Sequence, residues 1–120
     1  KFYNCEYRNA MTAIHVGTTL VAHRVREILL IMKYVRQHSQ LKNLPVYLYA
    51  DGSNAVPALQ AAVLDTDLTG IILMDCPSSF SEVIQSPQIR DWYSIVVPGI
   101  LQLYDLPVLN RYLKSRVRYR

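Results

Sequence analysis

The sequence has few of the residues from which many small proteins build metal, disulfide or phosphate sites. Its two cysteines, Cys5 and Cys76, cannot form a disulfide framework, and no Cys-x-x-Cys pair or Cys/His cluster suggests zinc. No run approaches the roughly 18 apolar residues of a membrane span, and the polar residues after Lys1 do not resemble a signal peptide. The glycine-rich motifs that bind nucleotide phosphates are also absent. We therefore expect no metal, no cofactor, no nucleotide and no membrane partner.

Acidic residues are the scarcer charged type, with 9 Asp and Glu against 13 Lys and Arg, for a net charge of +4. The excess lies near the end of the chain, at Lys114, Arg116, Arg118 and Arg120. Such a basic tail is usually solvated, so we expect no nucleic-acid partner. The composition, 51% apolar, predicts one globular domain over residues 1–120. An initiating Met is lacking, which suggests a processed or excised piece and leaves the compartment open.

A long helix is predicted by the spacing of apolar residues after residue 18. Thr18 or Thr19 is placed to cap its start, and the helix should end before Pro45. Its apolar stripe follows spacings of four, three, four and three: Val21, Val25, Ile28, Met32 and Val35.

The middle of the chain has the pattern of a β-α-β unit. Residues 45–50 and 70–76 are short apolar runs typical of strands that are covered on both faces. Residues 54–65 predict a helix between them, with Asn54 at its cap and Pro57 in its first turn. Two strands joined by such a helix should pair in parallel.

The remaining segments give weaker predictions. Residues 1–17 show no clear period, residues 77–83 indicate a loop, and residues 89–115 indicate short helical pieces. The alternating residues 116–120 could begin a third strand. Two strands are too few to close a parallel sheet. Either the two ends of the chain supply strands, or another chain does, or the chain belongs to a larger domain, and the pattern favours the last two.

The turn at residues 51–54 joins the first predicted strand to the following helix. This strand–turn–helix setting is the one in which many hydrolases hold a nucleophile, beside free N–H groups that stabilise an oxyanion. Two registers fit. With Ser53 at the nucleophile position, Asp51 occupies a place that favours glycine. With Gly52 at the nucleophile position, the small residue Ala50 fits better, and glycine adopts the strained backbone at little energetic cost. In this register the nucleophile is missing.

Three segments resemble parts of α/β-hydrolases. The elbow-to-next-strand segment of that family is similar to residues 48–83, LYADGSNAVPALQAAVLDTDLTGIILMDCPSSFSEV. In the acetyl-xylan-esterase-like and prolyl-oligopeptidase-like branches, the helix before the elbow often has the pattern A-x-R-V-x-(D/E)-I-L, which residues 22–38 resemble. Residues 97–113 resemble the segment that leads to the next strand. The likeness spans residues 18–117, although the elbow departs from G-x-S-x-G.

The resemblance implies a parallel sheet with helices on both faces and, in active members, a Ser-Asp/Glu-His triad in that chain order. Ser53 is then the candidate nucleophile, with Gly52 and Asn54 at the elbow and oxyanion positions. Asp75 follows the second predicted strand, where ligands gather in open α/β sheets, and is the candidate acid. Its alternative role is to cap the turn at residues 77–79.

The triad lacks a base. The three histidines, His15, His23 and His38, all precede the elbow, whereas the family's histidine follows it. A serine hydroxyl without a base is a poor nucleophile at neutral pH. We therefore expect no efficient acyl transfer from this chain alone.

The sequence thus predicts an α/β fold, a partial α/β-hydrolase-type parallel sheet flanked by helices and incomplete on its own. Its first functional reading is a fragment or remnant of a carboxylic-ester hydrolase, inactive unless a partner completes the site for a small ester. The alternative is a non-catalytic binding or assembly module that self-associates through open sheet edges. The expected partner is a second copy or the remainder of the domain.

Overall fold

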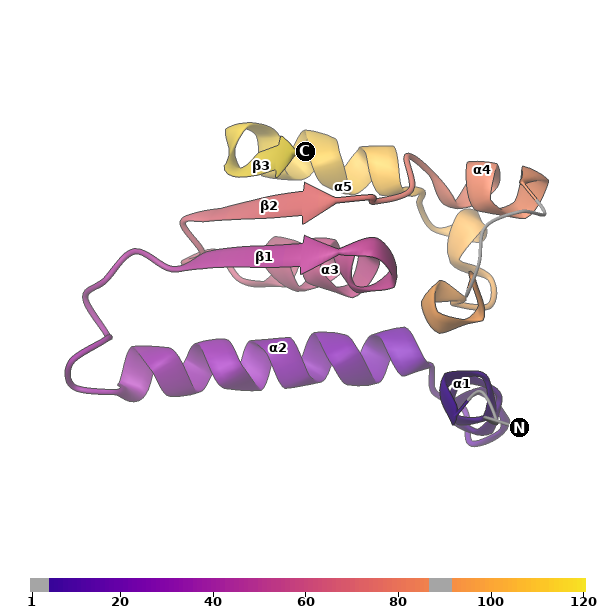
Figure 1. The fold of residues 1–120 in the computed structure, drawn as a ribbon, viewed down its shortest axis with the longest axis horizontal. Coiled ribbons are helices and arrows are strands. Elements are labelled where there is room, and N and C mark those ends of the chain that lie inside the picture. The colour runs from indigo at the N-terminus through magenta and orange to yellow at the C-terminus, as the bar shows by residue number, and fades with distance from the viewer. Residues whose placement is uncertain (1–4, 87–91) are drawn as a thin grey trace.

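The centre of the fold is a parallel sheet of three strands in the order β1-β2-β3 (Figure 1). The computed structural model describes residues 5–86 and 92–120. The strands are β1 (Tyr47–Asp51), β2 (Gly70–Met74) and β3 (Val117–Tyr119). The predicted α/β class and the parallel pairing are confirmed, and the tail does supply a third strand.

Helices account for most of the remaining described residues. The α-helices are α1 (Cys5–His15), α2 (Leu20–Gln37), α3 (Ala55–Leu64), α4 (Phe80–Gln85) and α5 (Leu106–Leu113). Four short 3₁₀ helices are η1 (Gly52–Asn54), η2 (Trp92–Ile95), η3 (Ile100–Gln102) and η4 (Lys114–Arg116).

Helix α2 forms where the apolar stripe predicted it. Thr19 is the cap, because its hydroxyl accepts a hydrogen bond of 3.0 Å from the backbone N–H of Ala22. Val21, Val25 and Met32 of the stripe are buried. The helix therefore presents one apolar face to the core, as its spacing indicates.

Helix α3 occupies the middle of the helical layer. It contacts β1 and β2 on one side and packs between α2 and α5, and Figure 1 shows it behind the sheet with those two helices to either side. Its sequence is apolar on nearly all sides, which suits a helix that is surrounded. The small side chains of Ala55, Ala58, Ala61 and Ala62 are all buried and let the neighbouring elements approach closely.

The opposite face of the sheet is uncovered in the described part of the chain. Tyr47 and Tyr49 project from it and are 63% and 60% exposed. The register places Ile72 beside Tyr49 on the same face, and the ring of Tyr47 lies over Gly70. The expectation that both strands are covered on both faces is therefore wrong for this structure. Helix α3, which contacts β1 and β2, packs on the face of the buried residues Ala50, Ile71 and Leu73.

Two segments differ from their predictions. Residues 5–15 form helix α1 although they show no clear period, and Ala10 and Ala13 are its buried residues. The predicted loop at residues 77–83 contains the start of α4, which Ser79 caps. The short helical pieces predicted for residues 89–115 are found as η2, η3 and α5, while residues 89–91 lie outside the described part.

An ion pair between the partly exposed Arg36 and the buried Asp65 joins the end of α2 to the end of α3. The guanidinium of Arg36 donates two hydrogen bonds, of 2.6 and 2.5 Å, to the carboxylate of Asp65. Asp65 is only 8% exposed and also accepts from the backbone N–H of Asp67. Burial alone would raise the pKa of Asp65, but the hydrogen bonds and charge of Arg36 outweigh it and hold that pKa below its ordinary value.

A second arginine, Arg116, binds the loop between α3 and β2. The guanidinium of Arg116, just before β3, donates to the backbone carbonyls of Asp65, Thr66 and Leu68. These carbonyls belong to the loop that leads from α3 into β2. Two cations therefore fix this loop: Arg36 at the end of α2 and Arg116 just before β3.

Removing the charge of Asp65 should destabilise the protein at neutral pH. We expect Asp65→Asn to lower the free energy of unfolding by about 2 kcal/mol at pH 7, because it leaves the partly buried Arg36 guanidinium without its anion. A carboxyl with a depressed pKa stabilises the fold above its ordinary pKa of about 3.9 and loses that contribution as the pH falls.

The difference in the free energy of unfolding between wild type and Asp65→Asn should consequently decrease below about pH 4. Urea unfolding at several pH values would measure this difference. Glu27→Gln, which removes an exposed carboxylate from α2, is the matched control. Its free energy of unfolding should stay close to that of wild type at every pH. If the difference in the free energy of unfolding between wild type and Asp65→Asn is constant from pH 7 to pH 3, the stabilising role of this ion pair is contradicted.

Candidate functional site

The turn between β1 and α3 is built around Gly52. Asp51 ends the strand with extended backbone, and Gly52 then takes a left-handed φ of +56°. Residues with a Cβ adopt this region at a cost, which explains glycine here. Ser53 and Asn54 complete the 3₁₀ turn η1, which runs directly into α3.

Asn54 does not cap α3 as the sequence predicted. Its backbone is already helical, and its side chain makes no capping hydrogen bond. The preceding 3₁₀ turn replaces the extended residue from which a capping side chain normally reaches back to the helix. The oxyanion role predicted for Gly52 and Asn54 therefore rests only on the backbone N–H groups of this turn.

The structure brings the turn and Asp75 to the same end of the sheet. Asp51 pairs with Met74, so that Gly52 and Asp75 both follow at the carboxyl ends of their strands. Asp75 is exposed and takes a left-handed φ of +47°, which is unusual for a residue other than glycine. Ser53 is partly buried, and neither side chain makes a hydrogen bond within the described residues.

Asp75 is not the cap of the turn that follows it. Ser79 caps α4 by accepting a hydrogen bond of 2.9 Å from the backbone N–H of Glu82, and the carboxylate of Glu82 accepts from Ser78. The pair differs from a capping box in that Glu82 accepts from Ser78 and not from the backbone N–H of the cap residue Ser79. The side chain of Asp75 is left free to meet solvent.

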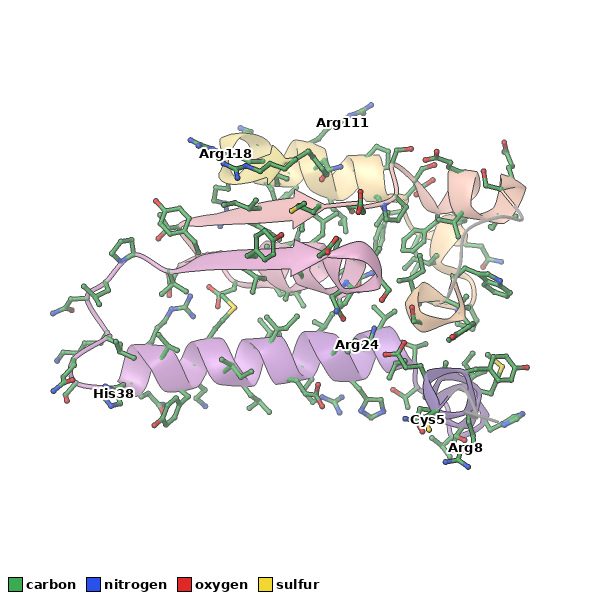
Figure 2. All side chains as sticks on the ribbon, in the orientation of Figure 1. Cys5, Arg8, Arg24, His38, Arg111 and Arg118 are labelled. Atoms are coloured by element: carbon green, nitrogen blue, oxygen red, sulfur yellow. The ribbon has the colours of Figure 1, made fainter. Side chains whose placement is uncertain are left out.

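No histidine hydrogen-bonds to Ser53. His15 and His23 are exposed, on α1 and α2. His38 lies at the far end of α2, as Figure 2 shows, while the turn lies at the carboxyl ends of the strands. The described residues thus give Ser53 no general base.

Cys76 is the remaining nucleophile near the turn, and its surroundings disfavour reaction. Burial raises the pKa of its thiol to about 11, so that very little thiolate exists at neutral pH. Its S–H donates to the carbonyl of Pro77 at 3.5 Å. Within residues 5–86 and 92–120, no group of three His, Cys, Asp or Glu side chains is placed to hold a metal ion.

Arg24 lies beside the turn and was missed by the sequence reasoning. Its guanidinium pairs with Glu6 of α1, and its Nη1 is buried without a hydrogen-bond partner among the described residues. A hollow of about 420 Å³ lies between α2, β1 and the start of α3, and its lining includes Arg24, Glu27 and Asp51. Because the guanidinium is already paired with Glu6 and its described neighbours in the lining include two carboxylates, the charge of this hollow does not favour an anion.

A second unforeseen residue is Asp105, which joins two helices beyond the carboxyl ends of the strands. Its carboxylate accepts from the backbone N–H of Leu106 at 2.7 Å, from that of Phe80 at 2.6 Å and from the hydroxyl of Ser81 at 2.9 Å. Burial would raise the pKa of Asp105, but these hydrogen bonds lower it. The sequence signal was present, since Pro107 follows Asp105 as a proline follows a helix cap.

Comparisons with protein-family models, curated proteins and solved structures found no match to this chain. The α/β-hydrolase resemblance therefore remains a prediction from the sequence. None of the described helices combines the length and the apolar character that crossing a membrane requires.

The left-handed turn predicts a specific cost for a side chain at position 52. A Cβ there would meet no atom within 4 Å, so the cost of Gly52→Ala comes from the backbone alone. We expect the free energy of unfolding to fall by about 1 kcal/mol for Gly52→Ala and by less for Gly52→Asn, because asparagine tolerates this region. Urea unfolding measures both.

Ser53→Ala is the control for this comparison, since Ser53 has ordinary backbone and its side chain makes no hydrogen bond with the described residues. It should change the free energy of unfolding by less than about 0.5 kcal/mol. Equal stability of Gly52→Ala and wild type would show that the turn is not left-handed in solution.

Proposed function

We propose that this chain is a segment or remnant of an α/β-hydrolase-type domain of the carboxylic-ester hydrolase lineage, without efficient catalysis of its own. The observation that carries the proposal is the turn at Gly52, Ser53 and Asn54 between a parallel strand and a helix. The candidate acid Asp75 follows the neighbouring strand at the same end. This is the arrangement in which hydrolases of that kind place a nucleophile.

The proposed lack of activity follows from the surroundings of Ser53. A serine hydroxyl needs a base to attack a carbonyl at neutral pH, and no histidine bonds to Ser53 within the described residues. The fold alone does not establish the chemistry. A small ester becomes a substrate in this proposal only when a partner contributes the base.

Hydrolysis of p-nitrophenyl acetate tests this proposal. Wild type and Ser53→Ala should give the same slow rate, close to that of the buffer, because the hydroxyl is not activated. Ser78→Ala, which alters an exposed serine on the following loop, is the matched control. A rate that is about a hundredfold above buffer and disappears only in Ser53→Ala would overturn the proposed inactivity.

A second candidate function, an assembly module, is supported by the uncovered sheet. β1 and β3 are edge strands, and the exposed tyrosines Tyr47 and Tyr49 lie on the face that no described helix covers. Unpaired strand edges and exposed aromatic surface both favour association with another chain. In this proposal, the second copy covers the open face of the sheet.

Sedimentation velocity over a range of protein concentrations tests the assembly function. Wild type should self-associate at micromolar concentration, and Tyr49→Lys should weaken the association about tenfold by placing a charge in the interface. Ser53→Ala, which lies away from the open face, should associate like wild type. Monomers at every concentration would exclude the assembly function.

A further inference from the structure

A hollow lies among α4, η2 and η3, beyond the carboxyl ends of the strands. Its volume is about 680 Å³, which is within the usual range of small-molecule sites. Phe80 and Val83 of α4 form one wall, and Ile95, Val97 and Ile100 face them from η2, the following turn and η3.

The lining of this cavity determines the chemistry of a ligand. None of its described side chains carries a charge, and its polar side-chain groups come from Ser86, Gln102 and the indole N–H of Trp92. An anionic or cationic ligand would lose its hydration here without gaining a counter-charge from the described lining. The lining therefore favours an uncharged and mainly apolar molecule with one or two hydrogen-bonding groups.

Two features hold the walls of the cavity in place before any ligand arrives. Asp105 binds the start of α4 through Phe80 and Ser81 and so fixes α4 to α5. Gly99 turns the chain into η3 with a left-handed φ of +77°, and its carbonyl accepts from Gln102 at 3.0 Å. A preformed cavity saves the ordering cost that a flexible surface pays on binding.

We propose that this cavity is a binding site for an uncharged aromatic or branched aliphatic small molecule. A peptide segment suits the cavity less well, because each of its residues brings a backbone N–H and C=O that need partners. The inference goes beyond the proposed hydrolase descent, since the lining includes neither Ser53 nor Asp75. Binding and ester hydrolysis can therefore fail independently.

The chain carries a reporter inside the proposed site. Trp92 is its single tryptophan, lines the cavity and is 52% exposed. N-phenyl-1-naphthylamine is an uncharged two-ring probe, and its sulfonated analogue, 8-anilino-1-naphthalenesulfonate, has the same skeleton with a negative charge. Saturable quenching of Trp92 by the uncharged probe is expected, with binding about tenfold tighter than for the sulfonate.

Variants locate the bound probe. Leu101, at the mouth of the cavity, is 43% exposed, so that Leu101→Glu should fold and weaken the uncharged probe about tenfold. Leu30→Glu adds the same charge to an exposed position of α2, and Tyr49→Lys alters the open sheet face. Both of these controls should bind within about twofold of wild type, because neither residue lines the cavity.

Three outcomes would overturn the proposal. The first is quenching that does not saturate, or a preference for the sulfonate. The second is an equal loss of binding in Leu30→Glu or Tyr49→Lys, which would place the probe elsewhere. The third is loss of binding in step with self-association of the protein, which would make a second copy the occupant of the cavity.

Discussion

The burial of α3 on nearly all of its sides is the constraint on which the rest of the structure depends. One short helix contacts two strands and two other helices at once. Four alanines make this possible, because small side chains allow close approach without leaving cavities. A larger side chain at the buried positions Ala58 or Ala62 would overpack α3 against its neighbours.

The order of elements around α3 could be predicted from the sequence, because each of them has a strong local pattern. The period of the apolar stripe identifies α2, and two short apolar runs on either side of an apolar helical segment identify the β-α-β unit of β1, α3 and β2. The covering of the sheet could not be predicted in this way. An apolar run such as residues 70–76 has the same sequence pattern whether one face or both faces of its strand are covered. The exposure of Tyr47 and Tyr49 on the neighbouring strand β1 shows that one face is open.

The turn itself was predictable, but its chemistry was not. Glycine at position 52 indicates a left-handed backbone directly. Arg24 pairs with Glu6, and Asp105 binds Phe80 and Ser81 in addition to the adjacent Leu106. No spacing rule could have identified the three distant partners, Glu6, Phe80 and Ser81. Helix α1 was missed because its pattern is weak, with buried alanines rather than large apolar residues marking its inner face.

The two edge strands of the sheet differ, because β3 is shorter and more basic than β1. Three residues long, β3 carries Arg118 and is flanked by Arg116 and Arg120. Two such basic rims would repel each other, and short charged edges are a common natural defence against unwanted strand pairing. Growth of the sheet by an incoming strand is thereby directed to the opposite rim, along the five residues of β1.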